Sequence, residues 1–181
     1  MAIWLVRAGR HGEQEDAALE KGIVVIGWEE LPDLSRVKTR EELAHLMNDT
    51  YPNERPNTLT NWRGQIWAFR ERIKANDLVV LPLKTRSAIA IGQVTGPYEY
   101  DPGGQQGGWC HTRKVIWLRT DFPRSVSIFG QDLLHSFGAF LTVCQIQRND
   151  AEKRITAIVQ RKHIPRSRSM ASVKRTQRLP S

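Results

Sequence analysis

The sequence predicts an α+β fold, and three observations support that prediction. An apolar, β-branched run at residues 23–28 is typical of a strand buried on both faces. Apolar residues recur at spacings of three and four over residues 58–75, which indicates an amphipathic helix. Two further apolar runs, at 78–83 and 87–94, flank a short polar turn and predict a β-hairpin. Strands and helices are therefore interspersed along a chain of 181 residues, which is long enough to bury one core.

The N-terminal part of the chain predicts a strand and two short helices around the buried strand. Residues 3–8 are rich in β-formers and precede a glycine-containing turn, so they predict a first strand. Residues 13–21 are acidic at the front and stop at a glycine, which favours a short helix. Thr39 and Glu42 have the spacing of a capping box, which predicts that a helix begins there and runs over 39–47.

The remaining elements are predicted from periodicity and from turn residues. The core-facing residues of the helix at 58–75 are expected to be Leu59, Trp62, Ile66, Phe69 and Ile73. Residues 101–108 are rich in Gly and Pro and predict a loop, whereas 109–119 alternate as a strand does. A helical turn is expected at 131–137 and a strand at 141–146. Residues 151–160 fit the helical and the strand period equally.

The positive charge of the chain is concentrated at its C-terminal end. The formal net charge of +8 favours a polyanionic partner. However, residues 161–181 contain seven Lys and Arg and no acid, so the other 20 basic residues and 19 acids leave residues 1–160 at +1. We expect residues 1–160 to form the domain and residues 161–181 to be a basic linker or disordered tail. Charge is therefore weak evidence for where a nucleic acid would bind.

Composition also indicates a compartment. No run approaches the ~18 apolar residues that a membrane span needs. The apolar start of the chain is too short for a signal peptide. Two cysteines, Cys110 and Cys144, fall short of a disulfide framework and suit a reducing environment. We expect a cytoplasmic protein.

The sequence shows no pattern of a catalytic or metal site. A PD-(D/E)xK nuclease needs a lysine two residues after an acid, and none of the 19 acids has one. Cys110 and His111 are neighbours on a strand, so they point to opposite faces and do not form a nucleophile–base pair. The five histidines lack metal-binding spacings, and the glycines at 103–108 lack the lysine of a phosphate-binding loop. We therefore expect no catalytic residue, metal or cofactor in this chain.

Aromatic and basic residues at strand ends indicate binding instead. Trp28 ends the buried strand and is followed by Glu29, so it either stacks a planar base whose amino group the acid accepts, or seals the core at its rim. Trp109, after the glycine-rich loop, presents the same two alternatives. The basic side chains expected to contact a phosphate backbone are Lys84, Arg86, His111, Arg113 and Lys114.

Three segments resemble a known superfamily. NWRGQIWAF at 61–69, ANDLVVLP at 75–82 and IAIGQVTGPY at 89–98 are similar to the EVE branch of the PUA-like superfamily, which includes YTH domains. With IWLVRAGRHGE, VVIGWEELPDLS and GAFLTVCQIQRNDAEKRI, residues 3–160 resemble the N-terminal domain of Mrr-type restriction endonucleases. The chain departs from the family at Asn76, where the related strand opens with glycine, and it ends where the family's nuclease domain begins.

The resemblance implies a PUA-like, EVE-type fold, which is a small twisted β-barrel with flanking helices. It also implies an aromatic pocket that holds a base flipped out of the DNA duplex, often a modified base. By position, the pocket residues are expected to be Trp28, Glu29, Pro82, Leu83 and Trp109.

The function expected from these features is recognition of a modified base in double-stranded DNA. The domain would supply specificity to a modification-dependent restriction endonuclease whose nuclease domain lies in the same parent chain. Two alternatives from other classes are an RNA-binding PUA-like module and a protein-interaction domain. No membrane partner is expected, and the oligomeric state is left open.

Overall fold

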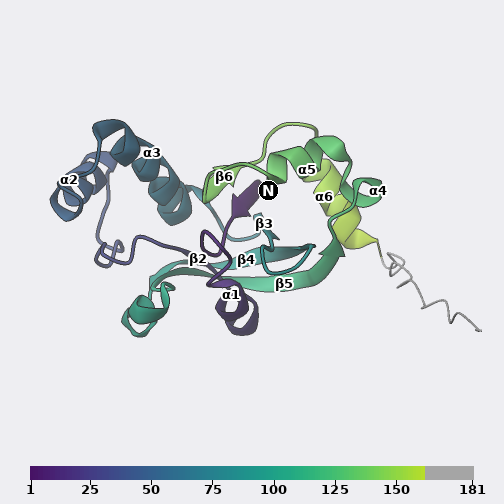
Figure 1. Cartoon of the computed structure of the whole chain (residues 1–181), viewed down its shortest axis with the longest axis horizontal. Coiled ribbons are helices and arrows are strands. Elements are labelled where there is room, and N and C mark those ends of the chain that lie inside the picture. Colours follow the sequence, from purple (N-terminus) through teal and green to yellow (C-terminus); the bar gives the residue numbers. More distant parts are fainter. Residues whose placement is uncertain (162–181) are drawn as a thin grey trace, which may run out of the picture.

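A curved, mixed β-sheet forms the centre of the computed structural model, which describes residues 1–161 (Figure 1). Its strands are β1 (Ile3–Val6), β2 (Ile23–Ile26), β3 (Leu78–Pro82), β4 (Ala88–Tyr100), β5 (His111–Pro123) and β6 (Val143–Gln145). The strand order is β2-β5-β4-β3-β1-β6, in which β1 and β3 are parallel and all other neighbours are antiparallel.

The sheet is open within residues 1–161. Its edge strands, β2 and β6, are joined by no hydrogen-bonded ladder. The α+β class predicted from the sequence is therefore confirmed, whereas the sheet does not form the closed barrel that the resemblance implies.

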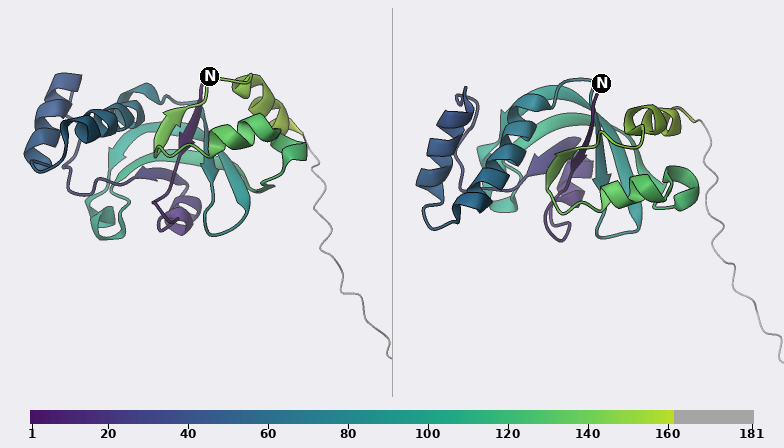
Figure 2. Two further views of the ribbon diagram at one scale, coloured as in Figure 1. Left: turned by 45° about the horizontal axis from the view of Figure 1, so that its top comes forward. Right: turned by 90° about the horizontal axis from the view of Figure 1, so that it is seen from above.

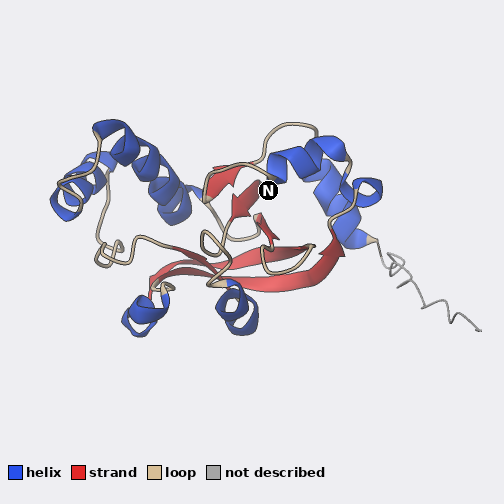
Figure 3. Ribbon diagram, viewed as in Figure 1, coloured by secondary structure: helices blue, strands red, loops and turns tan. Residues whose placement is uncertain are grey.

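Five of the six α-helices of the described residues lie at two ends of the sheet, and the first, α1 (Glu15–Lys21), lies against one of its faces (Figure 1). The others are α2 (Arg40–Thr50), α3 (Pro56–Trp67), α4 (Val126–Phe129), α5 (Gln131–Phe137) and α6 (Ala151–Gln160). Helices α2 and α3 lie at one end and α4 to α6 at the other, as all the views show (Figure 2, Figure 3). A π-helical turn, η1 (Ala68–Arg72), continues α3, and a 3-10 helix, η2 (Pro102–Gly107), precedes β5. No helix among the described residues is long and apolar enough to cross a membrane.

The two faces of the sheet bury separate apolar clusters. Trp4, Val24 and Phe69 belong to the cluster on the side of α2 and α3. A second cluster joins β1, β3 and β4 to α4, α5 and α6, and a third lies beneath α1. Strand β2 contributes Val24 to the first cluster and Val25 to the third, which confirms that it is buried on both faces although it lies at an edge.

Asp77 fixes the start of β3 against β1. Its buried carboxylate accepts hydrogen bonds from Ala2 N at 2.8 Å, Trp4 Nε1 at 3.0 Å and Lys74 N at 3.0 Å. The preceding residue, Asn76, has φ 74°, a left-handed conformation that glycine and asparagine tolerate best. Asn76 therefore suits the left-handed turn that precedes β3.

Most predicted elements are present, with shifted ends. The capping box is confirmed, because Thr39 Oγ1 accepts from Glu42 N at 3.1 Å and the Glu42 side chain bonds back. The ambiguous segment 151–160 is helical. Strand β4 extends to Tyr100 through an irregularity after Val94, which the sequence prediction ended too early. Helix α4 was not predicted. The segment predicted as a linker or tail, 161–181, lies beyond the described residues except for Arg161.

Candidate functional site

A cavity of about 840 Å³ opens where three loops meet. It is lined by the segment after β1, the end of β2 and the segment before β6, together with Lys84 from the β3–β4 turn. We call it the Trp28 cavity; the lining residues important here are Arg7, Arg10, Trp28, Glu29, Lys84 and Phe140. Its volume falls within the range of about 300–1,000 Å³ that is usual for ligand sites. Two predicted pocket residues and one predicted phosphate contact therefore come together.

Trp28 has a strained backbone at this cavity. Its φ is 65°, which is rare for a bulky side chain and costs on the order of 1–3 kcal/mol. Its carbonyl accepts two hydrogen bonds, from Leu31 N at 3.0 Å and from His111 Nε2 at 3.2 Å. The half-buried ring packs edge-on against Trp62, with ring centroids 5.9 Å apart. The surrounding contacts thus hold Trp28 in one conformation.

His111 is buried and positions Trp28, which corrects the expectation that it contacts a phosphate. The ring is 0% exposed, so it has no access to a DNA backbone. Its Nδ1 lies 2.7 Å from the Tyr98 hydroxyl oxygen, which itself accepts from Leu34 N at 3.2 Å. This network assigns the Tyr98 O–H as donor to Nδ1 and the Nε2–H as donor to Trp28. Burial lowers the pKa of His111, so the ring is held neutral.

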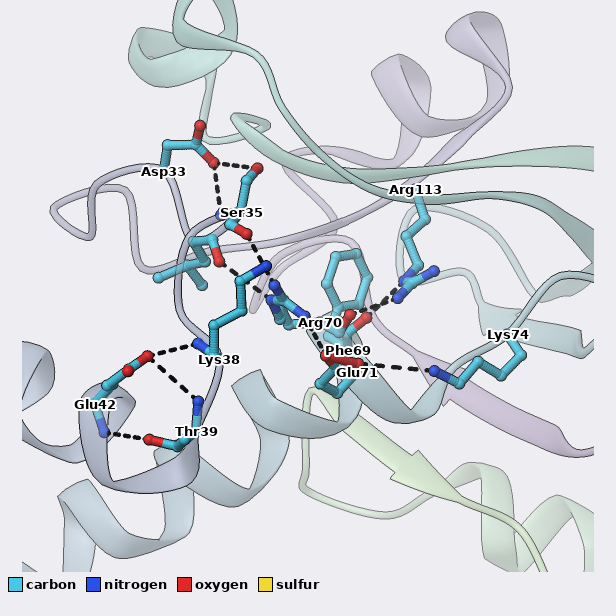
Figure 4. Close-up of polar contacts among 11 residues, drawn as sticks. Asp33, Ser35, Lys38, Thr39, Glu42, Phe69, Arg70, Glu71, Lys74 and Arg113 are labelled. Atoms are coloured by element: carbon cyan, nitrogen blue, oxygen red, sulfur yellow. Dashed lines mark hydrogen bonds and ion pairs between the residues drawn. The ribbon is translucent and has the colours of Figure 1, made fainter.

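Arg113 is also buried, and it stabilises the end of a helix. It is 3% exposed, and it donates to the carbonyl oxygens of Phe69 at 2.6 Å and Arg70 at 2.7 Å (Figure 4). A third donor reaches the carbonyl oxygen of Gly96 at 3.1 Å. The last carbonyls of a helix lack partners within it, and a cation there is favourable. Burial lowers the pKa of Arg113 to about 10. The expected contact of Arg113 with a phosphate backbone is therefore corrected.

The other predicted basic residues are exposed but separate. Lys84 lines the Trp28 cavity, and the buried Glu15 fixes its turn by accepting from Lys84 N and from Thr85 Oγ1. Arg86 is exposed in the same turn without lining the cavity. Lys114 is exposed on β5, with its Nζ 3.5 Å from Glu99 Oε1.

Three predicted pocket residues do not line the Trp28 cavity. Pro82 and Leu83 are buried, and Leu83 packs beneath α1. Trp109 borders a separate hollow of about 320 Å³, where Lys21 Nζ lies 4.4 Å from its ring centroid. The glycine-rich loop packs on this ring, because a Cβ at Gly104 would lie 2.3 Å from Trp109 Cε3. The loop is therefore glycine-rich for close packing.

Sequence reasoning missed the wall of the cavity that precedes β6. Arg7 donates to the Ala139 carbonyl from Nε at 3.1 Å and from Nη2 at 2.6 Å, and to the Phe137 carbonyl at 2.9 Å. Phe140, held at this wall, has a fully exposed side chain. The sequence analysis included the segment GAFLT only in the resemblance. No local pattern joins Arg7 to this wall, because Arg7 and Ala139 are 132 residues apart.

Charges of both signs line the cavity. Arg10 and Lys84 bring positive charge, and Glu13 and Glu29 bring negative charge. Among residues 1–161, the cavity included, no three His, Cys, Asp or Glu side chains converge in the manner of a metal site. The cavity thus offers an aromatic ring, carboxylates and flexible cations, which can contact a planar ring, amino hydrogens and phosphate respectively.

Comparison with known proteins identifies the family. No curated protein matches the chain. Among solved structures, the chain is similar to protein Atu2648 from Agrobacterium tumefaciens, at 12% identity over 88% of this chain and 91% of that one, with a TM-score of 0.38. That likeness is too distant to bear on fold or function. The sequence model described as "Domain of unknown function (DUF8426)" matches residues 4–136, so the chain belongs to this family.

Proposed function

We propose that this domain binds double-stranded DNA and recognises a modified base in the Trp28 cavity. The observation that carries the proposal is a strained tryptophan held beside a glutamate in a cavity of about 840 Å³. Strained backbone that its surroundings over-determine is concentrated at binding and catalytic sites. Trp28 also packs against the core, so the proposal rests on its left-handed conformation at the cavity.

The lining residues match the chemistry of a nucleobase. The Trp28 ring offers a face for stacking, which is worth ~1–3 kcal/mol per base. The carboxylate of Glu29 is an acceptor for the exocyclic amino group of cytosine or adenine. A base reaches such a pocket only when it is flipped out of the duplex, and stacking and edge hydrogen bonds must offset the loss of pairing.

The exposed cations beside the cavity suit the DNA backbone. Arg10 and Lys84 line the cavity and are exposed. Such contacts position the duplex without reading its sequence, and they weaken as salt rises. With His111 and Arg113 buried, we assign the phosphate contacts beside the cavity to these two side chains.

The resemblance to EVE and PUA-like domains, and to the N-terminal domain of Mrr-type enzymes, supports placing this recognition in a modification-dependent restriction system. In that system these residues would supply specificity, and a nuclease domain of the parent protein would supply cleavage. An open sheet is compatible with the proposal, because the Trp28 cavity is built by loops at the strand ends.

Binding to matched duplexes tests the proposal. Labelled duplexes of one sequence would carry cytosine, 5-methylcytosine, 5-hydroxymethylcytosine, adenine or N6-methyladenine at one position, with affinity measured by fluorescence anisotropy at two salt concentrations. We expect one modified duplex to bind at least tenfold more tightly, which corresponds to about 1.4 kcal/mol. Equal affinity for every duplex would overturn the proposal.

Two variants locate the site. Trp28→Ala should abolish the preference for the modified duplex. The matched control is Trp67→Ala, because Trp67 is also half-buried against the core but lies on α3 away from the cavity. If folded Trp28→Ala protein still discriminates, the base binds elsewhere.

Competition with RNA of the same sequence identifies an RNA-binding module if RNA displaces the DNA.

A further inference from the structure

We propose that Phe140 is a wedge that enters the DNA base stack at the position left by the flipped base. This inference rests on the proposed function and adds to it a residue that contacts the duplex rather than the flipped base. It assigns a role to an exposed aromatic side chain that neither the fold nor the base pocket explains.

Phe140 is the most exposed of the large hydrophobic side chains among the described residues. Its relative exposure is 104%, so it packs on nothing in the protein, and the adjacent Leu141 is 36% exposed. Isolated apolar residues on a surface are common, but Phe140 lies at the wall of the cavity that contains Trp28. An exposed apolar side chain therefore lies at the same cavity as the proposed base pocket.

The backbone on both sides of Phe140 is anchored. Before it, the Arg7 guanidinium donates to the carbonyls of Phe137 and Ala139. After it, the Gln65 Oε1 accepts from Thr142 N at 2.8 Å and from Val143 N at 3.1 Å. Because both flanks are tied to the sheet and α3, inserting the Phe140 ring would not require the loop to become ordered first.

A wedge would offset part of the stacking free energy that is lost when a base is flipped out. Extruding a base leaves a gap between its neighbours, which lose their stacking partner. Proteins that deform DNA insert apolar side chains such as Phe and Leu between base steps. The ring of Phe140 can fill the vacated position and stack on the neighbouring bases.

The experiment compares two duplexes that differ only in how much flipping costs. In one duplex the target base is paired, and in the other it faces a mismatch, so that its extrusion is already cheap. Affinities are measured for wild type, Phe140→Ala and Phe140→Trp, with 2-aminopurine beside the target as a fluorescent reporter of unstacking. The control is Val126→Ala, which removes an exposed apolar side chain from α4, away from the cavity.

The wedge predicts an effect of Phe140 that depends on the duplex. Phe140→Ala should weaken binding to the paired duplex about tenfold or more and alter binding to the mismatched duplex by no more than about twofold. At saturating protein it should also raise the 2-aminopurine signal, because the reporter base loses the ring that it stacks on, and Phe140→Trp should reverse both changes. Val126→Ala should bind as wild type does. Because the side chain is fully exposed, the unfolding midpoint should stay unchanged.

The outcomes separate the two proposals. If Phe140→Ala weakens both duplexes equally, Phe140 contacts the flipped base or closes over it, and the wedge is wrong while base recognition stands. If Phe140→Ala weakens neither duplex, the exposed ring has no part in DNA binding. The proposed function is decided by wild-type protein alone, through its preference between modified and unmodified duplexes.

Discussion

Replacing His111 with Phe tests whether a buried hydrogen-bond network holds Trp28 in place. The substitution keeps a ring of similar size but removes the donor to the Trp28 carbonyl and the acceptor of the Tyr98 hydroxyl. The lost bond is worth ~0.5–1.5 kcal/mol, and an unsatisfied buried hydroxyl costs ~1–3 kcal/mol more. We expect a loss of about 3 kcal/mol, which lowers the unfolding midpoint of a chain of this size by about 6–12 °C.

The same network predicts how stability depends on pH. Burial lowers the pKa of His111 in the folded protein, against the weaker, opposite effect of the Glu29 and Asp33 carboxylates. The unfolded chain binds a proton near the ordinary pKa of about 6.5, whereas folded His111 stays neutral. The contribution of His111 to stability is therefore full above about pH 6.5. It falls as the pH drops through that value, and it levels off below the folded-state pKa.

Urea unfolding of wild type and His111→Phe between pH 7.5 and 5 separates this effect from other titrations. Carboxylates affect both proteins alike, whereas only wild type loses the contribution of His111. The difference in free energy of unfolding between the two proteins should therefore narrow as the pH falls. His45→Gln, at an exposed position on α2, is the control and should leave the wild-type profile unchanged. A gap that stays constant or widens toward pH 5 would refute a neutral, buried His111. In addition, folded His111→Phe protein should bind the preferred duplex more weakly, because Trp28 has lost part of its support.

Three other substitutions, one of them with a matched control, probe features that the fold depends on, each by urea unfolding. Asp77→Asn should cost about 1–3 kcal/mol, because an amide cannot accept all three hydrogen bonds that the carboxylate accepts. Gly92→Ala should cost about 1–3 kcal/mol, since its Cβ would lie 2.8 Å from the Trp117 ring, whereas Gly64→Ala, with open space in α3, should be neutral or stabilising. Arg113→Met should cost about 2 kcal/mol or more by removing three donors from backbone carbonyls.

Local patterns predicted the elements of this fold better than their assembly. The capping residues Thr39 and Glu42 act within one turn, so their pattern is visible in the sequence. The period of the helix at 58–75 is also local, and α3 with η1 occupies most of that range. The sheet order is different, because β1 pairs with β3 across more than 70 residues of chain. Whether such a sheet closes depends on strand positions that no periodicity encodes.

The candidate site was predicted only where residues sit directly at strand ends. Trp28 and Lys84 follow β2 and β3, and both line the cavity. His111 and Arg113 also belong to a strand end, but a basic side chain there serves equally as a phosphate contact or as a buried donor. Their partners decide between the two, and those partners lie in distant segments, such as the carbonyls of Trp28 and Phe69.

Each wall of the Trp28 cavity that carries a proposed DNA contact is held by a polar side chain from another element. His111 of β5 holds Trp28, Glu15 of α1 holds the turn of Lys84, and Arg7 holds the backbone before Phe140. A ligand that meets walls already fixed loses less free energy to ordering them. Substitutions of the three anchoring side chains should therefore reduce stability and DNA binding together. Substitutions of the exposed Lys84 and Phe140 should reduce DNA binding alone, and that difference distinguishes a prepared binding site from a fortuitous surface hollow.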